Sequence, residues 1–139
     1  MSANSRMTVA VHALTLLAEP GGKWCASDWI AASVNTHPVV VRRTLAALQA
    51  AGLVEGQAGA KGGYRLAIPG RRVTLADVYR AMRDEGPFGL HAHAPNPQCP
   101  VGRAIQKHLT RVYDAAETAL EGSLRATTVA ALRGRITAG

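Results

Sequence analysis

One segment of the chain holds a side chain that could react with an oxidant. Residues 84–100 are rich in proline and glycine and include Cys99, shortly before a long helical pattern. The free N–H groups and the dipole at the start of a helix favour a thiolate, so Cys99 is a candidate redox sensor. A free cysteine is also often a small packing residue, and a purely structural Cys99 is the alternative.

Metal binding is a second chemistry that this segment could support. Imidazole and thiolate groups are suitable metal ligands, and a second copy of the chain could complete a site around His91, His93 and Cys99. The spacing of these residues matches no standard metal site, however, and histidines in loops are usually solvated. We therefore expect no bound metal or other cofactor.

Two further sources of a signal stay open. A small molecule could bind between the body of the protein and its long helix, lined by Trp24, Trp29 and Tyr79, although such aromatic residues more often belong to the core. Cys25 could be a redox partner of Cys99, provided that their Cα atoms lie within about 7 Å. Two cysteines are too few for a disulfide framework, and in a reducing compartment both are expected to be free.

Two short helices joined by a polar turn are predicted in the first half of the chain. Residues 27–34 form a helical pattern with Ser27 as its expected N-cap. After the turn, Pro38 suits the first position of a second helix, which is expected to end at Gly52. Helices joined by so short a turn are typical of a helix-turn-helix unit.

The second of these helices has one apolar and one basic face. Val41, Leu45 and Leu48 recur at helical spacing, so they are expected to face the core. Arg42 and Arg43 then lie on the solvent side near the start of the helix, where a recognition helix meets base edges and phosphates. An ordinary solvated face is the simpler interpretation of the two arginines.

A β-hairpin is predicted directly after this helix. Residues 53–57 and 64–68 are β-capable runs around a glycine-rich turn that carries Lys61. A hairpin in this place is a wing, and its glycines allow the backbone to approach a neighbour closely. A nucleotide-phosphate loop does not fit, because neither a GK[ST] sequence nor a helix start follows.

The remaining helices are predicted on both sides of this unit. A long apolar stripe of about 20 residues would span about 30 Å, which is too long for so small a domain to cover, so we expect it to pack against a second copy. The expected helices cover 5–19, 75–83 with Thr74 as N-cap, 101–120 up to an interruption at Gly122, and a short one within 123–136.

Charge and composition narrow the class of protein. The net charge is +7, and ten basic and four acidic side chains fall within residues 1–83, which suits a polyanionic partner. No apolar stretch approaches the roughly 20 residues that span a membrane, and the first residues lack the pattern of a signal peptide, so we expect a cytoplasmic protein with no membrane contact. No nucleophile motif and no pair of acids near a histidine is present, which argues against an enzyme.

These elements define the expected architecture. The fold class is mainly α with a small β wing (α+β). A winged helix-turn-helix domain is expected over residues 1–83, a loop with a candidate sensor cysteine over 84–100, and a long dimerisation helix with a C-terminal helix over 101–139.

Several motifs resemble one family of regulators. They are AAGLV at 50–54, GGYRLA at 62–67 and VTLADV at 73–78. The chain thus resembles the Rrf family of bacterial winged helix-turn-helix transcriptional regulators, which includes IscR, NsrR and CymR. NTHPVVVRR at 35–43 and NPQCPVG at 96–102 are most similar to its YwnA-like subgroup.

The resemblance implies a homodimer that binds double-stranded DNA at a roughly palindromic operator, with recognition helices in successive major grooves. The best-known members carry three closely spaced cysteines before the long helix, and this chain has only Cys99 there, so their cluster-sensing role is not transferred. We expect a repressor with a redox signal at Cys99, or alternatively an effector- or metal-responsive regulator with a structural Cys99. The DNA-facing candidates carried over by position are Thr36, His37, Val39, Val40, Arg42, Arg43 and Lys61.

Overall fold

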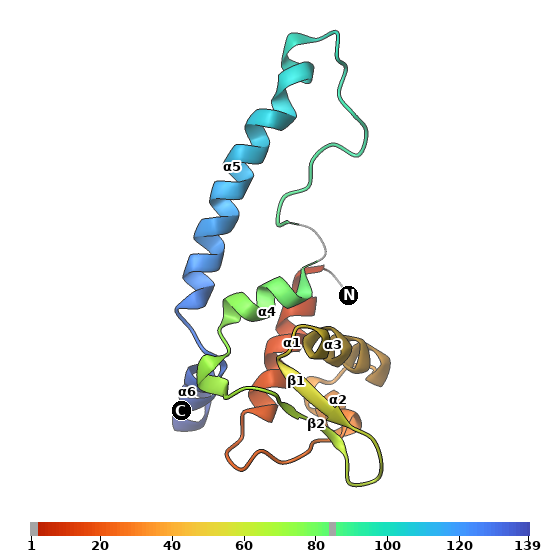
Figure 1. Cartoon of the computed structure of the whole chain (residues 1–139), viewed down its shortest axis with the longest axis vertical. Coiled ribbons are helices and arrows are strands. Elements are labelled where there is room, and N and C mark those ends of the chain that lie inside the picture. Colours follow the sequence, from red (N-terminus) through yellow and green to blue (C-terminus); the bar gives the residue numbers. More distant parts are fainter. Residues whose placement is uncertain (1–2, 84–85) are drawn as a thin grey trace.

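The computed structural model describes residues 3–83 and 86–139. Residues 1–2 and 84–85, which begin the expected DNA-binding domain and the expected loop, lie outside the described residues. Within the described part the chain is α+β, with one two-stranded sheet at the edge of a body of helices (Figure 1). The elements are α1 (Ala3–Leu17), α2 (Ser27–Val34), α3 (Pro38–Ala50), β1 (Val54–Gln57), β2 (Gly63–Leu66), the 3-10 helix η1 (Gly70–Arg72), α4 (Leu75–Met82), α5 (Pro100–Arg125) and α6 (Val129–Ala138).

The body of the protein is built around α1, which contacts α2, α3, α4 and α6. Its buried face meets the core face of α3, where Val41, Leu45 and Leu48 are fully buried as the helical spacing predicted. Val129 at the start of α6 is also fully buried in this core. The C-terminal helix therefore completes the same core that holds the helix-turn-helix in place.

The helix-turn-helix has well-defined ends. Pro38 is the first residue of α3, as predicted. Gly52 follows with a φ of +79°, and its N–H and that of Leu53 bond to the carbonyls of Gln49 and Leu48, which closes α3 in a Schellman motif. The expected N-cap at Ser27 is wrong: Ala26 occupies that position and Ser27 is already helical.

The later helices follow the sequence signals in part. Thr74 caps α4, and its hydroxyl and the Asp77 carboxylate form a reciprocal capping box. The expected break at Gly122 is wrong, because α5 runs unbroken to Arg125. A single glycine costs a helix only about 1 kcal/mol relative to alanine, which a helix of this length tolerates.

The wing is an antiparallel pair in which Val54 lies opposite Leu66 and Gln57 opposite Gly63. Two glycines of its turn are required by space. A Cβ at Gly62 would lie 2.0 Å from the carbonyl oxygen of Gln57, and one at Gly63 would lie 2.4 Å from that of Cys25. The glycines thus permit the close backbone approach that the sequence predicted.

Figure 1 shows the segment after α4 rising away from the body to the upper end of α5, and α5 then running back down toward α6. None of the residues of α5 is buried. Phe88 stacks on Tyr113 with ring centroids 4.9 Å apart, so the segment between α4 and α5 packs against α5. We call residues 86–125 the arm. Across residues 3–83 and 86–139, no helix has the length and apolar character needed to cross a membrane.

Candidate nucleic-acid interface

The DNA-facing candidates come from three segments, the α2–α3 turn, the first half of α3 and the turn between β1 and β2. Arg42, Arg43 and Lys61 are exposed, and so is Val39, at 38%. Thr36 and Val40 are half-buried at its edge. We call this set the recognition surface; it consists of Thr36, His37, Val39, Val40, Arg42, Arg43 and Lys61.

His37 holds the start of the recognition helix. It is the N-cap of α3, and its Nδ1 accepts a hydrogen bond from the Val39 N–H at 3.1 Å. With Nδ1 as acceptor, the neutral ring carries its proton on Nε2 and presents a donor on its far side. Sequence reasoning missed this capping role because histidine is not among the residues that commonly cap helices.

The cations of the recognition surface are unpaired. Within the part of the chain that the structure describes, Arg42, Arg43 and Lys61 have no carboxylate at ion-pair distance. An exposed guanidinium or ammonium without an internal partner is free to bind a phosphate or a base edge. The arrangement is therefore suited to a polyanion.

Some arginines elsewhere in the chain are engaged internally. Arg80 and Arg83 of α4 pair with Glu121 and Glu117 of α5; the Arg80 Nε lies 2.7 Å from the Glu121 carboxylate. We call this contact the α4–α5 junction. On the wing, Arg65 pairs with Glu55 and stacks on Trp24, a cluster that the sequence gave no reason to expect.

Cys99 lies where the sequence placed it, at the N-cap of α5. It is exposed, and its Sγ accepts from the Gly102 N–H at 3.5 Å. Space there is tight, since a Cβ at Gly102 would lie 2.7 Å from the Asn96 carbonyl oxygen. The Cys99 sulfur is thus the side-chain acceptor at the start of α5.

Cys25 has a different setting. It bonds through its backbone to Tyr64 of β2, whereas α5 begins at the far end of the arm (Figure 1). Partial burial and, less strongly, the nearby Glu19 carboxylate raise the pKa of the Cys25 thiol, and Lys23 opposes them. Cys25 and Cys99 are both free.

The other candidate metal ligands do not converge. His91 lies with its Nδ1 3.3 Å from the Nε2 of Gln106, and its loop is exposed. Residues 3–83 and 86–139 contain no group of three or more histidine, cysteine, aspartate or glutamate side chains that could hold a metal ion. A metal site built from His91, His93 and Cys99 of one chain is thus not supported.

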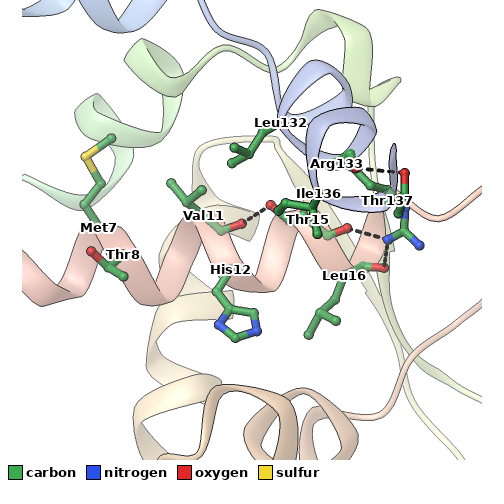
Figure 2. A pocket seen from close by; sticks show the side chains of 10 residues that line it. All are labelled: Met7, Thr8, Val11, His12, Thr15, Leu16, Leu132, Arg133, Ile136 and Thr137. Atoms are coloured by element: carbon green, nitrogen blue, oxygen red, sulfur yellow. Dashed lines mark hydrogen bonds between the residues drawn. The ribbon is translucent and has the colours of Figure 1, made fainter. Parts of the chain in front are cut away.

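An apolar groove of about 610 Å³ lies between α1 and α6 (Figure 2). It is a different place from the expected pocket beside the long helix, and Trp24, Trp29 and Tyr79 do not line it. Nor are these aromatics core, because Trp29 is 49% exposed and the other two are half-buried. The apolar lining residues are Met7, Val11, Leu16, Leu132 and Ile136.

Polar side chains connect this groove to its surroundings. Arg133 of α6 donates from Nη1 to the carbonyl oxygen of Thr15 at 2.7 Å, and Figure 2 shows it at the end of α1. His12 of α1 lies 3.0 Å from the hydroxyl of Ser33 in α2. The groove therefore borders both the C-terminal helix and the first helix of the helix-turn-helix.

Comparison with known families identifies the class of protein. Residues 3–134 match the Rrf2 family model, whose description is iron-dependent transcriptional regulator. The chain belongs to the Rrf2 family. It is 39% identical over 122 residues to YwnA of Bacillus subtilis (strain 168), named as an HTH-type transcriptional regulator, with 87% of this chain and 89% of YwnA covered.

Solved structures share the fold of this chain. A crystal structure named as a DNA-binding protein has 33% identity and a TM-score of 0.73 over 92% of this chain and 98% of its own. CymR, the global cysteine regulator of B. subtilis, shares the fold with a TM-score of 0.67 at 22% identity over 97% and 96% of the two chains. These relatives are regulators and DNA-binding proteins, not enzymes, so this Rrf2 protein is a DNA-binding transcriptional regulator.

The iron implied by the Rrf2 description does not fit the residues present. The chain has two cysteines, one beside β2 and one at the far end of the arm, and the described residues hold no candidate ligand cluster. A three-thiolate iron–sulfur site cannot be formed by one copy of this chain. We therefore derive no function from iron.

Proposed function

We propose that this protein is a homodimeric repressor that binds a roughly palindromic DNA operator. The unpaired cations of the recognition surface carry this proposal. Arg42 and Arg43 lie on the exposed face of α3, the element that enters the major groove in helix-turn-helix proteins, and Lys61 lies at the wing tip. In a dimer, two copies of α3 would meet half-sites about 34 Å apart, one helical turn of DNA.

The exposed arm supports a dimer. Its 26-residue helix α5 has no buried residue, and Val101 and Val112 are 67% and 61% exposed. A helix of that length extends about 39 Å, and its apolar stripe would be covered by a second copy packed in two-fold symmetry. Burying such side chains contributes about 25 cal/mol for each Å² of apolar surface.

A charge on this stripe tests the dimer. Val112→Asp is expected to shift the protein toward monomer in sedimentation velocity, while Thr110→Asp, an exposed position on the same helix, serves as the matched control. If both variants stay dimeric, α5 is not the dimer contact. A monomeric Val112→Asp variant should also bind a full palindrome no better than a half-site.

The signal proposed for this repressor is oxidation of Cys99. The Cys99 thiolate would attack hydrogen peroxide and break its O–O bond, which gives a sulfenic acid and hydroxide, and the hydroxide takes up a proton from solvent. Because Sγ accepts the hydrogen bond that caps α5, oxidation would alter the start of the arm and hence the spacing of the two recognition surfaces. Cys25 is expected to react more slowly, since its raised pKa and partial burial keep it a protonated thiol at neutral pH.

The experiment compares operator binding by wild type, Cys99→Ser and Cys25→Ser, with and without hydrogen peroxide. The expected result is loss of binding on oxidation in wild type and Cys25→Ser, and no change in Cys99→Ser. Mass spectrometry after brief alkylation should modify Cys99 first. An oxidant response that survives in Cys99→Ser would remove the redox proposal without affecting the DNA-binding one.

An effector-responsive regulator with a structural Cys99 is the second candidate. The groove between α1 and α6 favours it, because its volume falls within the range of about 300–1,000 Å³ that is usual for small-molecule sites. Narrowing the groove with Leu132→Trp would then abolish the response to an inducer in a reporter strain. A Leu132→Trp variant that responds normally would place the signal elsewhere.

A further inference from the structure

The wing is attached to the body by a segment outside the hairpin. Cys25 and Tyr64 exchange two backbone hydrogen bonds, at 2.9 Å and 2.8 Å, so the chain between α1 and α2 is joined to β2 by an isolated antiparallel bridge. Gly63 permits this approach. A two-stranded hairpin is at best marginally stable by itself, so we expect this bridge to contribute to the orientation of the wing.

Three side chains lie next to one another on the face of the wing that points away from the core: Trp24, Arg65 and Glu55. Cys25 and Tyr64 pack toward the core, and their neighbours Trp24 and Arg65 lie on the opposite face because side chains alternate along a strand. Arg65 is directly opposite Glu55 in the sheet register and pairs with its carboxylate. The guanidinium carbon of Arg65 lies 4.1 Å from the centre of the Trp24 ring.

Arg65 is therefore held from two sides, by the ring of Trp24 from the α1–α2 connection and by the carboxylate of Glu55 from β1. Lys61 differs from it in every respect, since it is exposed, lies at the turn and has no carboxylate partner among the described residues. A cation between a carboxylate and an indole face is already compensated. Such a cation is a poor phosphate ligand, but it can hold β1, β2 and the α1–α2 connection together.

We propose that Trp24 and Arg65 are positioning residues that set the direction of the wing, so that Lys61 reaches a DNA phosphate. This inference rests on the proposed contact of Lys61 with DNA. It assigns Trp24, a residue of the α1–α2 connection, to the DNA-binding apparatus, and it gives Arg65 a positioning role in place of a direct phosphate contact.

The test uses the salt dependence of binding, which counts phosphate contacts and does not follow fold stability. Each contact contributes about 0.9 to the slope of log K against log salt concentration. Lys61→Ala should lower the slope by about that amount. Trp24→Leu leaves the charge unchanged, yet it is expected to lower the slope as Lys61→Ala does and to add little in the Lys61→Ala background.

Two conservative variants keep the test informative if Trp24→Leu folds poorly. Trp24→Phe retains a ring face and should bind a promoter fragment with the wild-type slope. Arg65→Lys keeps the charge but loses the planar group that stacks and pairs, and should lower the slope. Arg80→Lys makes the same change at an ion pair away from the wing and is the matched control, expected to be silent.

The outcomes separate the two levels of the proposal. If Lys61→Ala lowers the slope but Trp24→Leu and Arg65→Lys do not, the positioning role is wrong and the proposed function stands. If Arg65→Ala lowers the slope by a further contact in the Lys61→Ala background, Arg65 is a phosphate ligand and the inference fails. If Lys61→Ala itself has no effect, the wing contact in the proposed function is wrong, and the positioning inference falls with it.

Discussion

The recognition surface and the α4–α5 junction both present arginines to solvent, but in different settings. At the junction, Arg80 and Arg83 reach across to carboxylates on α5. On the recognition surface, Arg42 and Arg43 follow one another along α3 with no carboxylate at ion-pair distance in the described residues. Basic residues of one chain can therefore have different roles. Cations that are paired within the chain hold its parts together, and unpaired cations on one face are available to a ligand.

The largest effect is expected on the recognition surface. Arg43→Ala should weaken operator binding by about 1–3 kcal/mol, because it removes a contact that the chain does not compensate. The free energy of unfolding should change by less than about 0.5 kcal/mol, since an exposed side chain without a partner is removed. Fluorescence anisotropy titrations and urea unfolding of the same preparations measure the two quantities.

Arg80→Ala is the control for this difference. It removes the same charge from an exposed arginine that is paired, so it should leave operator binding nearly unchanged at physiological salt. Equal losses of affinity in Arg43→Ala and Arg80→Ala would mean that overall charge, and not the recognition surface, drives binding.

A smaller effect is expected at the start of α3, where recognition and stability meet. His37→Ala removes the side-chain acceptor for the Val39 N–H and should lower the free energy of unfolding by about 1 kcal/mol. His37→Asn restores an acceptor at the cap and should recover most of that loss. Comparing the two variants in DNA titrations separates capping from DNA contact, because only a direct contact by the imidazole would leave His37→Asn impaired. A His37→Ala variant of wild-type stability would contradict the capping role.

The smallest effect is expected at the junction. Breaking the pair of Arg83 with Glu117 should lower the free energy of unfolding by about 0.2–1 kcal/mol, because the arginine is 41% exposed and solvent screens the pair. A double-mutant cycle of Arg83→Gln and Glu117→Gln measures the coupling. The coupling should shrink as salt is raised. A value well above this range would show that the arm is held to the body more firmly than two solvated ion pairs allow.

The sequence predicted the elements whose signals are local. Pro38 and Gly52 mark the ends of α3, and Thr74 marks the start of α4, because each acts through its own backbone or its nearest turn. The core face of α3 was predicted by helical spacing, since Val41 and its partners have only one way to leave solvent. The position of Cys99 at the start of α5 was predicted by the same local logic.

Features that depend on contacts between distant segments could not be predicted. The stacking of Arg65 on Trp24 is one example, because no local pattern predicts that Trp24 approaches β2. The groove between α1 and α6 exists because the chain returns to α1 after the arm, a matter of tertiary packing. The interruption expected at Gly122 was wrong for a related reason. One glycine costs a helix only a small free energy, and the rest of α5 outweighs it. The candidate DNA-facing residues rest on resemblance and exposure, and their roles stay predictions.

The buried position of Val129 limits how early during synthesis the body of the protein can complete its core. Val129 is fully buried in the core, and its N–H bonds to the carbonyl of Val73 beside the start of α4. During synthesis, the helix-turn-helix and the wing leave the ribosome long before this residue does. A chain released or cleaved within the arm would leave the space of Val129 unfilled and apolar surface of α1 uncovered. Such a product should be a substrate for proteolysis and not a truncated DNA binder, so the protein is protected from acting before it is complete.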